Sequence, residues 1–352
     1  MNTGSIQRHV QLLCAMMIDR RPVLITRHSP SVSSLFSVPV RKVSTLVGVL
    51  FVAIGTLCAQ TAPRPRIVGI SHIGLLTHDL NASRAFYGDF LGFQEPYSLS
   101  NPDGSLSMTF FKVNDHQYIE LYPERSASEA NKDRETHISF ETDDIEGLRA
   151  YLASKGVAVP EHAHHGRIGN LSFEFIDPAG HRVEMVQYMP SGKTVAAYGK
   201  YMSDSRISKH MMHVGIIVTE LDPEYRFYTE ILGFKETWRG SSTGKTLSWV
   251  NLKLPDADDY LELMLFKDEP EQTHRGTPHH LCLEVPDIPS AVMTLQARPY
   301  AKMSGRPIEA HVGVNLKRQV NLFDPDGTRT ELMEPGTVHG NPPPPSTAPP
   351  PG

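Results

Sequence analysis

The chain is poor in cysteine, and beyond its first 60 residues it is also poor in basic side chains. Its three cysteines are at positions 14, 58 and 282 of 352 residues, so only Cys282 lies outside the N-terminal segment. A lone cysteine cannot form an internal disulfide in the rest of the chain. Residues 61–352 hold 28 basic and 38 acidic residues, without a basic stripe. This balance argues against nucleic acid and anionic membrane surfaces as partners.

Long hydrophobic runs are also scarce, and the exception is the uncharged run Ser44–Ala59. At about 16 residues it is short for a membrane span but typical of the apolar part of a signal peptide. Arg41 and Lys42 precede it, and Ala59-Gln-Thr-Ala62 follows it. The pattern predicts that residues 1–60 are a signal peptide with an N-terminal extension, and that the protein is periplasmic or extracellular. The alternative is a membrane anchor at residues 44–59.

The rest of the chain contains an internal repeat. Met211–Glu236 is nearly a second copy of Ser71–Glu95 when the two are aligned from His213 and His72, with the same Phe-Tyr pair and Leu-Gly-Phe run. Repetition at so long an offset indicates duplicated domains rather than a solenoid of short units. Each copy predicts a strand that carries a histidine, a short amphipathic helix, a glycine stop and a second strand.

The same order of elements occurs four times, which predicts four βαβββ modules. The modules are residues 67–122, 136–188, 209–266 and 279–334, and they pair into domains 67–188 and 209–334. Residues 189–208 are expected to be a linker. The proline-rich residues 335–352 are expected to be a disordered tail.

One histidine and one glutamate recur at the same places in every module. The first strands hold His72, His137, His213 and His280, and the last strands hold Glu120, Glu184, Glu262 and Glu331. Strand alternation places each of these residues on the face opposite its apolar neighbours, such as Ile119 and Leu121 beside Glu120. If each pair of modules curls its sheet into a cup, two imidazoles and two carboxylates converge inside it.

Such a convergence predicts a metal site. Buried carboxylates are costly unless they are paired or bound to a metal, and a divalent cation would also relieve their mutual repulsion. Two nitrogen and two oxygen ligands suit Fe, Mn, Ni, Zn or Co, with open positions for substrate oxygens. We therefore expect one or two divalent metal ions per chain. The alternative is that duplication copied structural histidines that bind no metal.

These motifs resemble the vicinal oxygen chelate superfamily, which includes glyoxalase I, methylmalonyl-CoA epimerase, extradiol dioxygenases and antibiotic-resistance proteins. The resemblance rests on the strand-one histidine, FYxxxLGF after it, and DPxGxxxE before the last ligand. It implies an α+β fold in which each pair of modules forms a curled mixed sheet, a cup with the helices outside. It also implies two metal quartets, one of His72, Glu120, His137 and Glu184, the other of His213, Glu262, His280 and Glu331.

Three functions follow from this resemblance. A complete His-Glu-His-Glu set is similar to that of glyoxalase I, which implies a lyase or isomerase with Glu184 or Glu331 moving a proton. Four modules in one chain instead resemble Fe(II) extradiol dioxygenases, whose triad matches His213, His280 and Glu331. Asn321 stands where that family has a tyrosine. The third function is a resistance-type protein that binds a small molecule.

Other expectations concern the partners and the remaining candidate residues. The partner would be a small substrate with adjacent oxygens, and the protein would be a monomer or a homodimer. His279 precedes His280, so its side chain is expected to point the opposite way and to be structural. Cys282 is expected to be a small buried thiol, and the Phe86-Tyr87 pair is expected to lie in the core.

Overall fold

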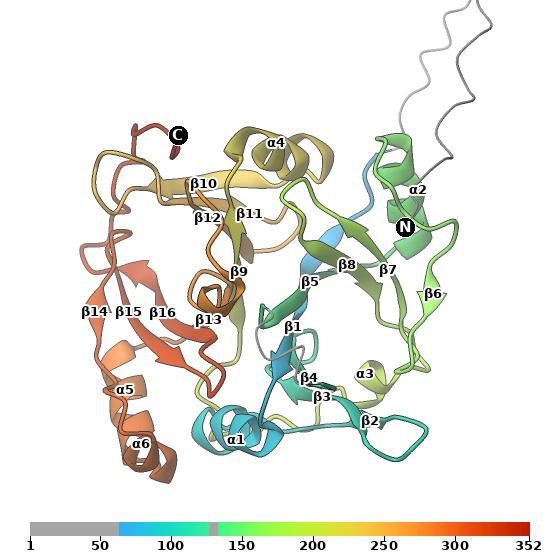
Figure 1. Cartoon of the computed structure of the whole chain (residues 1–352), viewed down its shortest axis with the longest axis horizontal. Coiled ribbons are helices and arrows are strands. Elements are labelled where there is room, and N and C mark those ends of the chain that lie inside the picture. The colour runs from blue at the N-terminus through green and yellow to red at the C-terminus, as the bar shows by residue number, and fades with distance from the viewer. Residues whose placement is uncertain (1–62, 127–132) are drawn as a thin grey trace, which may run out of the picture. The chain divides into compact units, whose positions relative to one another are not determined.

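The computed structural model of the chain describes residues 63–126 and 133–352, and residues Gln60–Gly352 form one compact unit (Figure 1). The predicted signal peptide lies outside the described residues and stays a prediction. Within the described ranges, no helix has both the length and the apolar character that crossing a membrane requires.

The first half of this unit is one eight-stranded mixed sheet. Its strands are β1 (Ile67–Thr77), β2 (Ser98–Ser100), β3 (Leu106–Lys112), β4 (Tyr118–Pro123), β5 (Glu135–Thr142), β6 (His164–His165), β7 (Leu171–Ile176) and β8 (Arg182–Gln187). They are ordered β2-β3-β4-β1-β5-β8-β7-β6. The central strand β1 runs parallel to β4 and antiparallel to β5, and β5 runs parallel to β8.

The second half repeats this topology strand for strand. Its strands are β9 (Met211–Val218), β10 (Lys235–Gly240), β11 (Trp249–Lys253), β12 (Tyr260–Leu265), β13 (His280–Glu284), β14 (His311–Val312), β15 (Lys317–Phe323) and β16 (Arg329–Thr337). They are ordered β10-β11-β12-β9-β13-β16-β15-β14. The predicted fold class, α+β with two curled mixed sheets, is confirmed.

Helices connect the strands of each half. They are α1 (Leu80–Arg84) continuing into the π-helical turn η1 (Ala85–Phe90), α2 (Ile145–Ser154), α3 (Lys193–Ala196), α4 (Leu221–Arg226) continuing into η3 (Phe227–Ile231), the 3-10 turn η4 (Gln272–His274), α5 (Ile288–Ala297) and α6 (Pro299–Ser304). The carboxylates of Asp79, Asp144 and Asp287 accept backbone N–H bonds where α1, α2 and α5 begin. Such caps satisfy N–H groups that have no partner in the first turn.

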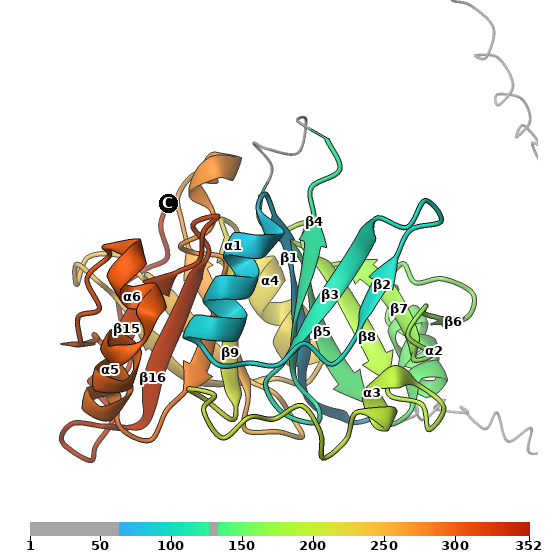
Figure 2. The same cartoon turned by 90° about the horizontal axis from the view of Figure 1, so that it is seen from below.

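The two halves interlock through their helices. Figures 1 and 2 show α1 (cyan) between β1 of the first half and β16 of the second. The Tyr87 hydroxyl at its end donates to Asp324 Oδ2 over 2.9 Å, and in the repeated position Tyr228 donates to Asp177 Oδ2 over 3.1 Å. Most of the buried apolar side chains of both halves form one continuous core. Phe86 and Tyr87 belong to it, as predicted.

The C-terminal tail differs from its prediction. The last strand, β16, continues to Thr337, and the segment beyond it is bonded to the second sheet. The backbone N–H of Ser346 donates to Arg239 O over 2.9 Å, and the Leu247 N–H donates to Pro349 O over 2.7 Å. The prediction of a disordered tail is wrong for these contacts, because the edge of a sheet offers backbone partners that sequence composition does not reveal.

The two halves differ at one buried position of their first helices. The first half has Ser83 there, and the second half has Glu224, which is fully buried. Its Oε2 accepts the Ala179 N–H over 3.0 Å. Burial, followed by the charge of Asp177, raises the pKa of Glu224 to about 10. The folded protein therefore holds a proton at neutral pH that the unfolded chain, with a pKa near 4.5, has released.

Glu224→Gln should flatten the pH dependence of stability. Because the folded state binds the extra proton between these two pKa values, the free energy of unfolding of the wild type should fall as pH rises, by up to about 1.4 kcal/mol per pH unit. Glutamine has no proton to lose. Relative to the wild type, the free energy of unfolding of the variant should therefore increase with rising pH, as measured by urea titrations from pH 5 to 9. The prediction is wrong if the free energies of unfolding of the wild type and the variant change with pH in parallel. The control is Glu220→Gln, at an exposed position.

Candidate functional site

The register of the first sheet brings the predicted residues into two adjacent rows. Across one row, His72 pairs with Ser139 and Ser139 pairs with Glu184. Across the other, Glu120 and His137 both pair with Gly74. Paired residues of neighbouring strands point to the same face, and so do residues two apart on one strand. All four candidates therefore lie on one face of the sheet, as predicted.

The glycine two residues after the strand-one histidine is a requirement of this arrangement. A Cβ on Gly74 would lie 2.3 Å from His137 Cε1, and a Cβ on Gly215 would lie 2.0 Å from His280 Cε1. Real side chains do not approach so closely, so any larger residue would push the second histidine out of the site. His-x-Gly in the repeated strand is thus part of the site, which the sequence analysis did not recognise.

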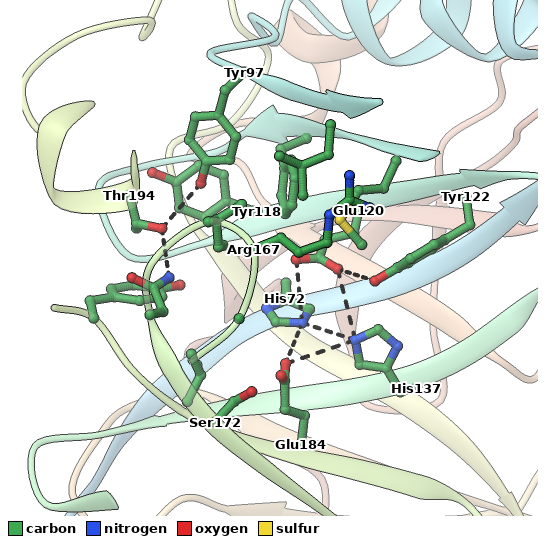
Figure 3. A pocket seen from close by; sticks show the side chains of 18 of the residues that line it. His72, Tyr97, Tyr118, Glu120, Tyr122, His137, Arg167, Ser172, Glu184 and Thr194 are labelled. Carbon is green, nitrogen blue, oxygen red and sulfur yellow. Dashed lines mark hydrogen bonds and ion pairs between the residues drawn. The ribbon is translucent and has the colours of Figure 1, made fainter. Parts of the chain in front are cut away.

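The side-chain nitrogens and oxygens of the first quartet (His72, Glu120, His137 and Glu184) converge closely (Figure 3). The Nε2 atom of His72 lies 2.9 Å from that of His137, 2.9 Å from Glu184 Oε2 and 3.6 Å from Glu120 Oε1. His137 Nε2 lies 3.9 Å from each glutamate. Ligands held at about 2.1 Å from one ion stand about 3.0 Å apart at right angles and about 3.4 Å apart in a tetrahedron. Among these residues, His72, Glu120 and His137 form a group whose ligand atoms all lie within 4.8 Å of one another, so they could hold one metal ion, and Glu184 adjoins it through His72.

The charges of the first quartet are strongly coupled. Burial lowers the pKa of His72, but the carboxylates of Glu120 and Glu184 outweigh it and raise that pKa above its ordinary value. Burial and the charge of His72 lower the pKa of His137 to about 3. Burial opposes ionisation of Glu184, yet the hydrogen bond and charge of His72 lower its pKa to about 2. These shifts have one cause: the buried carboxylates favour positive charge at His72, so a cation is favoured at this place.

The outer nitrogen of His72 is held by a chain of hydroxyl groups. His72 Nδ1 lies 2.9 Å from Ser71 Oγ, which lies 2.6 Å from the Tyr188 hydroxyl, and this hydroxyl donates to His116 O over 2.8 Å. With Tyr188 donating to a carbonyl, Ser71 donates to Tyr188 and accepts from His72 Nδ1–H. With the proton on Nδ1, the lone pair of Nε2 faces the quartet. A histidine that binds a metal through one nitrogen is usually held by such a bond from the other nitrogen.

An open cavity lies above the first quartet, with about 720 Å³ of empty space that includes some open to solvent. Its wall is mostly aromatic and apolar, with a few polar groups: Tyr97, Leu99, Met108, Phe110, Tyr118, Tyr122, Arg167, Ser172, Val186, Tyr188 and Thr194 line it among others. Thr194 belongs to α3, so the predicted linker contributes to the wall. A mostly apolar cavity with a few converging polar groups is typical of a small-molecule site.

The second quartet (His213, Glu262, His280 and Glu331) also converges, but its two histidines do not reach the adjacent cavity. His213 Nε2 lies 3.0 Å from His280 Nε2 and 3.4 Å from Glu331 Oε2, and His280 Nε2 lies 3.5 Å from Glu262 Oε2. Both histidines are fully buried. The adjacent cavity is lined by Glu262 and Glu331 but by neither histidine. Cys282 is a buried thiol beside the quartet, as predicted.

A guanidinium reaches the inner nitrogen of the second quartet. His280 Nδ1 lies 2.7 Å from Pro278 O, so it carries the proton, and Arg329 Nη2 donates to Nε2 over 2.9 Å. The lone pair that a metal would need is therefore engaged. In the first half, Arg182 Nη2 lies 3.4 Å from the outer nitrogen, Nδ1, of His137. Burial and then Arg329 hold the pKa of His280 well below its ordinary value.

The sequence analysis identified all eight quartet residues and missed their supporting groups. Tyr122 donates to Glu120 Oε2 over 2.7 Å, and it belongs to the same strand two residues further on. Strand alternation, which puts Tyr122 on the same face as Glu120, was the available signal. Arg182 and Arg329 each stand two residues before a quartet glutamate, and no sequence rule separates their two orientations.

Fold and site together define a class of protein. Each half is a curled sheet of two βαβββ modules, with paired histidines and glutamates at its centre, which is the architecture of a vicinal oxygen chelate protein. Two family models described as the glyoxalase/bleomycin resistance protein/dioxygenase superfamily match residues 69–185 and 212–315, together more than half of the chain. The chain belongs to this superfamily.

Two curated proteins of known name are similar in sequence. Lactoylglutathione lyase of Schizosaccharomyces pombe is 26% identical over 215 residues, which cover 56% of this chain and 66% of the lyase. The mitochondrial methylmalonyl-CoA epimerase of Mus musculus is 29% identical over 133 residues, which cover 35% of this chain and 71% of the epimerase.

Solved structures share the fold at lower identity. The Mn(II)-bound glyoxalase from Novosphingobium aromaticivorans has a TM-score of 0.57 at 20% identity, over 77% of this chain and 83% of that one. A homoprotocatechuate 2,3-dioxygenase variant from B. fuscum has a TM-score of 0.58 at 19% identity, over 77% of this chain and 72% of that one. The 2,3-dioxygenase LapB from Pseudomonas sp. KL28 has a TM-score of 0.56 at 17% identity, over 82% of this chain and 97% of that one.

Proposed function

We propose that the first half is a divalent-metal-dependent lyase or isomerase that moves a proton on a carbon next to an oxygen of a small substrate. The observation that carries this proposal is the first quartet at the floor of an open cavity, with four converging donor atoms and no guanidinium among them. The relatives named as a lyase and an epimerase support it. Inversion of a carbon centre by an epimerase is most directly achieved by removing and returning a proton.

Three of the four quartet residues would hold the metal throughout. His72 and His137 supply imidazole nitrogens, and Glu120 is fixed by the hydroxyl of Tyr122. Burial, followed by the charge of Glu120, holds the pKa of Tyr122 well above its ordinary value, so this hydroxyl stays a donor. The bound cation would supply Lewis-acid stabilisation of negative charge on a substrate oxygen.

Glu184 is the residue best placed to carry the proton. Its side chain is 15% exposed, against 6% for Glu120, so it faces the cavity more openly. The equivalent Glu331 is 3% exposed and lies in the second quartet, beside Arg329. A carboxylate within reach of both substrate and metal is suited to general acid–base work. Of the two candidates from sequence, we therefore assign the role to Glu184.

The test uses deuterium exchange, because the substrate is unidentified. Metal-replete protein in D₂O would be incubated with 2-hydroxyacyl and 2-methylmalonyl thioesters, and exchange at the carbon beside the carbonyl would be followed by NMR. We expect exchange that disappears after chelation of the metal and returns with Mn(II), Ni(II) or Zn(II). The proposal fails if metal-replete protein exchanges no proton on any of them.

Iron-dependent ring cleavage is the second candidate, favoured by the fold shared with two extradiol dioxygenases. The triad for that reaction would be His213, His280 and Glu331, and the bond from Arg329 to His280 Nε2 opposes iron binding there. Oxygen uptake on catechols by Fe(II)-loaded protein would favour this candidate over proton transfer. The third possibility, sequestration of a small molecule, would show binding without turnover.

Arg329→Gln should open the second quartet to metal. Removing the guanidinium frees His280 Nε2 and takes a positive charge away from Glu262 and Glu331. We expect mass spectrometry of dialysed protein to find one more metal equivalent per chain in this variant than in the wild type. Arg182→Gln is the matched control, since Arg182 contacts only the outer nitrogen of His137 within the first quartet. An unchanged count in Arg329→Gln would refute the interpretation.

A further inference from the structure

A third group of ligand-type side chains lies outside both quartets, where the two halves meet. Glu135, His181 and His279 each place one ligand atom within 4.8 Å of the others. Glu135 opens β5, His181 follows the turn after Asp177, and His279 immediately precedes β13. The group therefore draws two residues from the first half and one from the second.

Two atoms of this group are buried without hydrogen-bond partners. His279 is 3% exposed, and its Nε2 atom makes no hydrogen bond. The Oε2 atom of Glu135 is likewise buried and unbonded. Leaving a buried polar atom unpaired destabilises the fold. A cation between these side chains would supply a partner to His279 Nε2 and to Glu135 Oε2.

The outer nitrogen of each histidine faces an acceptor. His181 Nε2 lies 2.7 Å from Ile217 O; since a carbonyl only accepts, this nitrogen carries the proton and Nδ1 keeps its lone pair. His279 Nδ1 lies 2.8 Å from Asp133 Oδ2, at an angle too bent for a hydrogen bond but close enough to orient the ring. The two rings are 5.2 Å apart and nearly perpendicular. This is how metal-binding histidines are usually held.

The repeat provides an internal comparison. The alignment that equates Asp177 with Asp324 and His137 with His280 places Pro278, Thr328 and Thr136 opposite Glu135, His181 and His279. Proline and threonine at those places offer no imidazole or carboxylate ligand. Within the described residues the repeat thus has no counterpart of this group, so the shared fold does not require it.

We propose that Glu135, His181 and His279 bind one structural transition-metal dication, of the Zn(II) or Co(II) class, that links the two halves. Two imidazoles and one carboxylate are a donor set typical of zinc. The side chains would close by a few tenths of an ångström to reach ligand separations of about 3.0–4.2 Å. This site is independent of the proton transfer proposed for the first quartet.

The test counts metal in the full chain after refolding with Zn(II) and dialysis. His279→Gln and His181→Gln should each lose one zinc equivalent relative to the wild type, and the double variant should lose no more than either. His279→Gln could fail to fold. In that case His181→Gln still serves as the test, because glutamine at position 181 can also donate to Ile217 O and the fold should be kept. The exposed His274→Gln should lose none.

Thermal unfolding supplies a second measurement. Added Zn(II) should raise the Tm of His72→Ala, whose first quartet is disabled, and the further change His181→Gln should remove that rise. The proposal is overturned if His181→Gln and His279→Gln keep the wild-type zinc count. A loss of zinc only in His72→Ala would support the first quartet alone, so the two proposals fail separately.

Discussion

Replacing His72 with alanine should remove one metal equivalent and lower kcat/KM by about 10³-fold or more. His72 Nε2 makes the closest contacts in the first quartet, to His137 and to Glu184, so its loss leaves the carboxylates without their central partner. A metal centre contributes several kcal/mol to the stabilisation of charge in a transition state, and each 1.36 kcal/mol is a factor of ten in rate.

His213→Ala is the control for this result. His213 occupies the same place in the second quartet and is fully buried, so both variants remove an imidazole from the centre of a sheet. We expect this variant to lower thermal stability while changing kcat/KM by less than about threefold, because an isolated structural change far from the chemistry leaves the transition state intact. Equal losses of activity would show that the second quartet is also catalytic.

Glu184→Gln should lower kcat by about 10²–10⁴-fold while the metal stays bound. Removing a positioned general base typically costs this much. His72, His137 and Glu120 remain as ligands, and the glutamine oxygen occupies the place of the carboxylate. Steady-state kinetics on the substrate identified by exchange, together with metal counting on the same sample, would measure both effects.

The matched variant for Glu184 is Glu331→Gln. It makes the same chemical change at the same strand position in the second quartet, where Arg329 already contacts His280. It should leave kcat within about twofold of the wild type. If Glu331→Gln impairs kcat and Glu184→Gln does not, the proton carrier belongs to the second half and our assignment is wrong.

Most of the fold and all eight quartet residues could be predicted from sequence, because both follow local rules. Strand alternation fixes the face on which Glu120 lies, and helix spacing fixes the buried stripe that contains Tyr87. These rules act within one element, so each module reveals them by itself. The four repetitions then removed the ambiguity that a single histidine in a strand would leave.

What could not be predicted depends on contacts between elements far apart in the sequence. Arg182 and Arg329 occupy the same strand position, yet one reaches the outer nitrogen of a histidine and the other the inner nitrogen. His279 was expected to be structural because it points away from His280. Its proximity to Glu135 and His181 depends on how the two halves pack, which no local pattern encodes.

The exchange of tyrosines between the halves has a consequence for how the protein can evolve. Tyr87 reaches the turn at Asp324 and Tyr228 reaches the turn at Asp177, so each copy of the ancestral unit supplies part of the other's interior. If the second half does no chemistry, as we propose, it would still be needed as a scaffold for the first. Its helices and turns would then stay under selection even though Arg329 engages His280.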